Sequence, residues 1–292
     1  MSMSEDVALR PGQPLGPALS ATARELLAKI GLDQATTEAE AIHDFRRAVK
    51  RWRAFLRLVE PIVGETARTL RDEARDMARS LAGARDAQAA LDALNDLGED
   101  YAVLTPRSLA TVTKRIDDMR SSAEQMTLTP EIREKMQSMQ ATAVAEMDQW
   151  PLDEVGFHDV AKGLTVGYRR ARNAIPKDWT TATPEALHEF RQRVVVHRYQ
   201  MELAEPAWPR LGKLWVGELQ RLRERLGKHQ DLTVLTTQTQ RGQLLARWRK
   251  ILVPAIEARR RDHIEMAMRL TGRLFAERPQ DFQRRIEAVW EP

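Results

Sequence analysis

The 292-residue sequence contains no cysteine, which excludes a disulfide framework and a thiolate metal site. No stretch approaches the roughly 18 consecutive apolar residues that a membrane-spanning helix needs. The first residues, MSMSEDVALRPGQPLGP, lack the apolar core of a signal peptide. Aromatic residues amount to only 5%. These absences favour a protein of the reducing cytoplasm that makes no membrane contact.

Apolar residues make up 42% and charged residues 30% of the chain, which is typical of a globular protein with an aliphatic core. Strong helix formers dominate, and apolar residues recur at spacings of three and four along almost the whole chain. No run resembles a strand. The pattern predicts an all-α protein with helices near residues 18–30, 37–60, 65–97, 106–124, 130–149, 155–174, 184–205, 210–240, 243–277 and 279–290.

Prolines mark several expected ends of these helices. Residues 1–17 contain three prolines and two glycines, and we expect them to form a flexible leader. Thr183 and Pro184 suit the cap and the first position of a helix. Pro61 and Pro206 are each expected to stop a helix, because proline disfavours the α conformation of the residue before it.

The charge is small in total and uneven along the chain. The formal net charge is +4. Residues 95–154 carry twelve acids and six bases, whereas residues 155–231 carry nine acids and fourteen bases. A modest total with local concentration indicates a basic patch and hence a polyanionic partner.

Residues 41–59, AIHDFRRAVKRWRAFLRLV, form the most basic stretch of the predicted helices. At 100° per residue, one face of this helix carries His43, Arg46, Lys50, Arg53 and Arg57, with Arg47 and Arg51 beside it. Like charges at such spacings repel by a few tenths of a kcal/mol per pair. Because arginine presents a planar fork that suits phosphate oxygens, we expect this face to bind phosphate groups.

The basic helix has a second copy, which predicts an internal duplication. Pro61 and Pro206 are 145 residues apart, and at that offset AIHDFRRAVKRWRAFLRLVEP overlays ALHEFRQRVVVHRYQMELAEP. The second copy contributes His188, Arg191 and Arg198 to the same face, while Val195 and Glu202 replace a lysine and an arginine. Arg193 is expected to point away from the ligand. We expect two similar helical halves, 18–150 and 151–292.

Further basic residues are expected to extend the anion-binding surface. Just before the second copy lie Arg169 and Arg170, and after it follow Arg221, Arg225 and Lys228. In the first half, Arg85 precedes Asp86.

The sequence resembles the CHAD family, the conserved histidine α-helical domain. The resemblance rests on HDFRRAVKRWR and HEFRQRVVVHRY, on LAGARD and LGKHQD, on GYRRAR, and on the ending LFAERPQDFQRRIEAVW. It implies two pseudo-symmetric bundles of long helices with a basic channel between them. It also implies binding of inorganic polyphosphate, often at cytoplasmic granules, in a family that is not known mainly for catalysis. We expect no enzymatic activity, no metal and no cofactor. The E-x-E-x-K motif of a CYTH domain has no counterpart, so we expect a stand-alone CHAD domain.

Two other functions fit parts of the sequence. A basic helical surface also serves nucleic acids, although single-strand binding usually adds aromatic residues for base stacking. His43-Asp44 and His158-Asp159 could each belong to a metal-dependent phosphohydrolase of the HD type. That site needs further ligands, because adjacent helical residues point about 100° apart.

Overall fold

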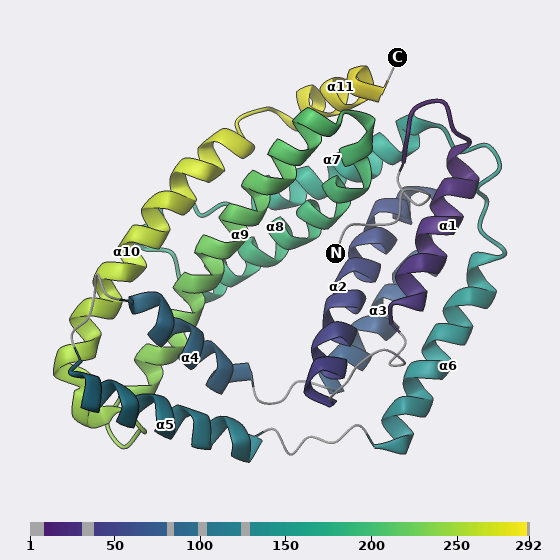
Figure 1. The fold of residues 1–292 in the computed structure, drawn as a ribbon. Helices are drawn as coiled ribbons and strands as arrows, with labels where there is room; N and C mark the ends of the chain where they lie inside the picture. The colour runs from purple at the N-terminus through teal and green to yellow at the C-terminus, as the bar shows by residue number, and fades with distance from the viewer. Residues whose placement is uncertain (1–8, 31–37, 81–84, 99–103, 124–128, 291–292) are drawn as a thin grey trace.

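The computed structural model describes residues 9–30, 38–80, 85–98, 104–123 and 129–290, and within these ranges it is all-α (Figure 1). The side chains of residues 38–40, 80, 85–86 and 120–123 are outside this description. Its helices are α1 (Leu15–Ala28), α2 (Glu38–Val63), α3 (Glu65–Ser80), α4 (Arg85–Leu97), α5 (Pro106–Ala123), α6 (Pro130–Met147), α7 (Phe157–Asn173), α8 (Pro184–Ala204), α9 (Pro209–Gln238), α10 (Arg249–Leu274) and α11 (Pro279–Trp290). The predicted fold class, all-α, is confirmed.

Local sequence signals explain several helix ends. Thr183 caps α8, since its Oγ1 accepts a hydrogen bond from the Ala186 amide at 3.3 Å, and Pro184 takes the first position as predicted. α8 ends just before Glu205, also as predicted. The predicted stop at Pro61 is wrong. α2 runs on to Val63 and ends before Gly64, whose φ of 71° breaks the helix at little cost to glycine.

The expected leader and the expected long helix 65–97 both differ from the structure. Residues 1–8 lie outside the described part, but Leu9 is buried and α1 begins at Leu15, three residues before the predicted start. The segment 65–97 forms two helices instead of one. α3 packs on α2 and α6, whereas α4 packs on α5 and α9, so the two helices belong to different parts of the core (Figure 1).

The larger core joins α1, α2, α3, α6, α7, α8 and α11 with parts of α9 and α10. Trp52 is its largest buried side chain, and its ring stacks on those of Phe55 and Trp150 at centroid distances of 5.8 and 6.3 Å. α7 crosses α2 closely because Gly163 has no side chain. A Cβ there would lie 2.1 Å from the carbonyl oxygen of Leu58. This approach brings the basic end of α7 beside α2.

A smaller core lies between α4, α5, the C-terminal half of α9 and the N-terminal half of α10. Asp96 on α4 fastens it, since its buried carboxylate lies 2.6 Å from His263 Nε2, 3.1 Å from Arg259 Nε and 2.7 Å from Lys228 Nζ. Burial alone would raise the pKa of Asp96. The hydrogen bonds from His263, Arg259 and Lys228 outweigh burial and hold that pKa well below its usual range.

The helices follow one another in the same order in both halves of the chain. Shifted by the 145-residue offset, α1, α2, α5 and α6 fall on α7, α8, α10 and α11, and α3 with α4 falls on α9. This order agrees with the predicted duplication, which stays a prediction, as do the halves 18–150 and 151–292. Each of the two cores draws residues from both halves.

Candidate anion-binding site

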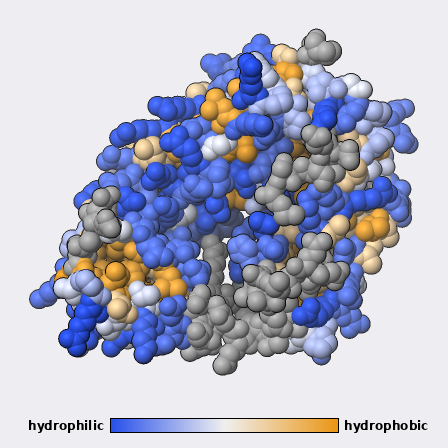
Figure 2. Space-filling model, in the orientation of Figure 1, coloured by the Kyte–Doolittle hydropathy of each residue, from blue (hydrophilic) through white to orange (hydrophobic). Residues whose placement is uncertain are grey.

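The basic face of α2 is divided between solvent and neighbouring helices. His43 and Lys50 are exposed, while Arg46, Arg53 and Arg57 are partly buried. Figure 2 shows the molecule hollowed between its α1–α3 side and its α8–α10 side, with walls that are mostly hydrophilic. The N-terminal half of the face is therefore accessible, and the C-terminal half packs against other elements.

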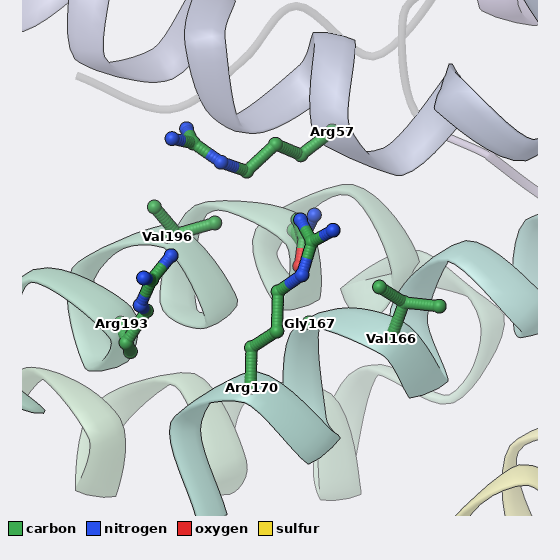
Figure 3. Close-up of a pocket in the computed structure, with 7 residues that line it drawn as sticks. Arg57, Val166, Gly167, Arg170, Arg193 and Val196 are labelled. Carbon is green, nitrogen blue, oxygen red and sulfur yellow. The ribbon is translucent and has the colours of Figure 1, made fainter. Parts of the chain in front are cut away.

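Five arginines from four helices gather around the C-terminal half of α2. We call this group the arginine cluster. It consists of Arg53 and Arg57 on α2, Arg71 on α3, Arg170 on α7 and Arg193 on α8. In Figure 3, Arg57 extends over Arg193 and Val196 of α8, and Arg170 rises towards it from α7. Arg57, Arg170 and Arg193 line a small pocket with Val166, Gly167, Val196 and Gln200.

The cluster is electrostatically strained. Burial, and then the positive charges of Arg53, Arg71, Arg193 and Arg170, lower the pKa of Arg57 to about 9. The pKa of Arg53 is also lowered, first by burial and then by neighbouring arginines of α3. An anion placed between these guanidinium groups would relieve the repulsion. The strain therefore marks a position where negative charge is favourable.

Acidic neighbours neutralise only part of the cluster. Arg71 pairs with Glu60, and Arg193 pairs with Glu189 at 3.1 Å. Within the described ranges, Arg53, Arg57 and Arg170 form no ion pair with an acidic side chain. Arg57 donates a hydrogen bond to a backbone oxygen, that of Arg53, at 3.3 Å. Three guanidinium groups are thus available to an external anion.

Another part of the α2–α8 contact carries its own acid. Glu202 pairs with Arg198 on α8 and, at 3.4 Å, with Arg51 on α2. Both guanidinium groups also lie over the ring of Tyr199, at 4.3 Å for Arg198 and 5.4 Å for Arg51. These two predicted site residues are therefore engaged within the protein.

The model of the CHAD domain family matches residues 18–240. The chain belongs to this family. Its structure is similar to the crystal structure of the CHAD domain from the plant Ricinus communis, with a TM-score of 0.59, 18% identity, and coverage of 99% of this chain and 96% of that one. It is also similar to PptA from Streptomyces chartreusis, with a TM-score of 0.62, 18% identity, and coverage of 92% and 100%. At this identity the likeness concerns the fold. No curated protein matches.

The two histidines of the CHAD motifs have different surroundings. His43 is exposed near the start of α2. His188 is partly buried, and its Nδ1 lies 2.9 Å from Gln230 Oε1, which also accepts a hydrogen bond from Arg191 at 2.9 Å. Because Gln192 Nε2 lies 2.5 Å from His188 Nε2, the hydrogen bonds fit a neutral ring that donates through Nδ1. His188 and Arg191 thus fasten α8 to α9.

The remaining predicted residues lie at separate places of the CHAD domain. Arg169 is exposed on α7 beside Arg170. Arg221 pairs with Glu218 at 2.6 Å, and Lys228 binds the buried carboxylate of α4 described above. Three residues complete this placement: Arg225 Nη1 lies 3.3 Å from His263 Nδ1, Arg47 pairs with Asp44 at 3.5 Å, and the side chain of Arg85 lies outside the described part.

Sequence reasoning missed two contributions to the cluster. Arg193 was expected to point away, but it lines the pocket with Arg57, because α7 and α2 cover the side of α8 next to its basic face. The stripe Arg71, Arg75 and Arg79 on α3 was not recognised. Its i, i+4, i+8 spacing was the signal that could have revealed it, and all three charges act on Arg53.

The HD dipeptides have structural partners. His158 Nδ1 lies 2.7 Å from Glu287 Oε1, and Asp159 accepts a hydrogen bond from the Gly156 amide at 3.3 Å, capping α7. Asp44 pairs with Arg47. In the described ranges, no three His, Asp or Glu side chains are grouped to hold a metal ion. None of the described helices combines the length and apolarity that crossing a bilayer requires.

Proposed function

We propose that this CHAD domain binds inorganic polyphosphate through the arginine cluster and the exposed basic face of α2. The observation that carries the proposal is the convergence of Arg53, Arg57 and Arg170, none of which forms a salt bridge with an acidic side chain in the described part of the chain. Guanidinium groups form short, charge-assisted and bidentate hydrogen bonds with phosphate oxygens. His43 and Lys50 supply further contacts along the same face.

Polyphosphate suits this site better than a nucleic acid does. Binding of single-stranded nucleic acid usually uses exposed aromatic rings on which bases stack. The pocket is lined by arginines, valines, a glycine and a glutamine. Trp52 is buried in the core, and Arg51 and Arg198 cover the ring of Tyr199. A chain of phosphates needs cations and no stacking surface.

The proposed role is binding without catalysis, with polyphosphate granules of the cytoplasm as the place of action. This part follows from the resemblance of the motifs to the CHAD family. The pocket offers cations to a ligand, and its Gln200 is already bound to the Ala54 carbonyl oxygen at 3.2 Å. We expect no cofactor and no metal to be needed.

Calorimetric titration with short polyphosphate of defined length tests the proposal. The affinity should fall steeply between 50 and 200 mM salt, by analogy with the counterion release of nucleic acids, whose affinities fall by about 10³ to 10⁵ over this range when six to ten phosphates are contacted. Arg170→Glu should reduce the affinity at least about tenfold. Arg24→Glu, the matched charge reversal on α1, should change it less than about twofold because Arg24 pairs with Asp148 on an exposed surface.

Two results would contradict the proposal. One is the absence of saturable polyphosphate binding at low salt. The other is equal loss of affinity in the Arg170 and Arg24 variants, which would place binding outside the cluster. Competition by single-stranded DNA at equal phosphate concentration separates the alternatives. DNA that displaces polyphosphate on equal terms would favour the nucleic-acid function.

A further inference from the structure

Glu202 is held by two arginines from different helices at the contact of α2 with α8. Its carboxylate pairs with Arg198 and Arg51, and the side chains of Glu202, Arg198 and Arg51 are only 18%, 13% and 21% exposed. Tyr199 lies beneath both guanidinium groups. Two arginines and a ring therefore surround one anion, and here the anion belongs to the protein.

The register of the two basic helices gives Glu202 a specific counterpart. At the 145-residue offset, Arg198 falls on Arg53 and Glu202 falls on Arg57. The same helical position thus carries a guanidinium in α2 and a carboxylate in α8. Around Arg57 of α2 the result is the strained arginine cluster, in which guanidinium groups are available to a ligand. Around Glu202 of α8 the result is one carboxylate shared by Arg51 and Arg198, which offsets one of their two positive charges.

We propose that Glu202 closes a second phosphate site, formed by Arg51 and Arg198, and thereby confines polyphosphate to the α2 side. This inference rests on the proposed function. The carboxylate satisfies the two arginines only in part, because Arg51 Nε and Arg198 Nε are buried without a hydrogen-bond partner. A phosphate group carries more acceptor oxygens than a carboxylate and could reach these donors.

Neutralising Glu202 should open this site. In Glu202→Gln, both guanidinium groups lose their counter-charge and become available to a longer stretch of the ligand. We expect the affinity for polyphosphate at 50 mM salt to rise about tenfold, since one or two charge-assisted contacts are added. The slope of log affinity against log salt should steepen by about 0.7 per added contact, the value for single-stranded nucleic acid.

The matched control is Asp148→Asn. It removes the same charge from an acid that also pairs with an arginine, Arg24, but on an exposed surface formed by α1 and α6. Its polyphosphate affinity should stay within about twofold of the wild type, because exposed pairs contribute little. A second variant, Glu202→Ala, removes the carboxylate and its oxygens and should raise the affinity as well. Adding Arg198→Gln to Glu202→Gln should remove most of the gain.

The outcomes separate this inference from the proposed function. If the wild type binds polyphosphate and both Glu202 variants bind no more tightly than Asp148→Asn, the closed site is refuted and the proposed function stands. If Arg198→Gln leaves the gain of Glu202→Gln intact, the gain arises elsewhere and the inference is again refuted. A wild-type protein without saturable binding would overturn both.

Discussion

Arg57 should lower the stability of the unliganded protein and raise its affinity for polyphosphate. The variant Arg57→Met tests both effects. Methionine keeps an unbranched apolar stem against Val166 and Val196 but removes the charge that the cluster repels. The unliganded variant should therefore be more stable than the wild type. The same variant should bind polyphosphate about tenfold more weakly, because a charge-assisted contact is lost.

The pKa of Arg57 sets the scale of the gain. Burial and four neighbouring arginines lower it to about 9, and one pKa unit corresponds to about 1.4 kcal/mol. The stability gained by removing this charge is at most roughly 5 kcal/mol, and side-chain relaxation and solvent screening should reduce it to about 1–2 kcal/mol. The folded-state pKa lies below the unfolded one, so the charge costs stability wherever both states are protonated. The stabilisation of the fold by Arg57→Met should be full at pH 7 and shrink as the pH rises above about 9.

Urea unfolding at pH 7 and low salt, with and without short polyphosphate, measures both effects. At a ligand concentration of 100 times the wild-type Kd, the wild type should gain about 2.7 kcal/mol from the ligand, and a variant with tenfold weaker binding about 1.4 kcal/mol. Arg24→Met is the control and should change stability by less than about 0.5 kcal/mol, since Arg24 is an exposed residue paired with Asp148. If Arg57→Met without ligand is less stable than the wild type, Arg57 is a stabilising residue and the reasoning fails.

Three further variants test the interior by urea unfolding. Gly163→Ala places a Cβ 2.1 Å from the Leu58 carbonyl oxygen and should cost about 2–4 kcal/mol. Asp96→Asn should lower the free energy of unfolding by about 3 kcal/mol at pH 7. Because the pKa of Asp96 is lowered in the folded state, its carboxylate stabilises the fold only above the unfolded-state pKa, so the loss should shrink below about pH 4. Burial, and then the charge of Arg285, lower the pKa of His197 to about 3, so between pH 6.5 and 3 only the unfolded chain takes up the proton. His197→Phe removes this proton uptake and should therefore stabilise the fold increasingly as the pH falls from 6.5 towards 3. An unchanged Gly163 variant, a pH-independent Asp96 loss or a pH-independent His197 effect would contradict the respective argument.

Helix content was predictable because it depends on local pattern, and the exceptions have non-local causes. Thr183 and Pro184 mark the start of α8 through interactions within one turn. Pro61 misled the prediction because α2 continues through it to Val63, although proline has no amide N–H to donate and disfavours the α conformation of the residue before it. The change from α3 to α4 reflects packing on different partners, α2 in one case and α9 in the other, which periodicity does not encode.

The basic face of α2 was predictable for a similar reason, whereas the composition of the cluster was not. The 3.6-residue period places Arg53 and Arg57 on one side of a single helix without reference to any neighbour. Arg170 and Arg193 join them through the contacts of α7 and α8 with α2. The close approach at Gly163 is part of this arrangement, and although the sequence places this glycine within a helix, it does not reveal which neighbouring helix approaches it.

At the 145-residue offset, Arg57 of α2 and Glu202 of α8 share one helical position of this CHAD domain but carry opposite charges. Around α2, Arg57 adds repulsion to a cluster that its acidic neighbours neutralise only in part, so part of the folding free energy is stored where a polyanion can release it. On the α8 side, Glu202 supplies the negative charge from within, so the fold gains an internal pair and the site loses its need for a ligand. Under the proposed function, stability and polyphosphate affinity are opposed at this position. A carboxylate at this position offsets the charge that a phosphate chain would bind, so a site that stays open to the ligand also stays strained.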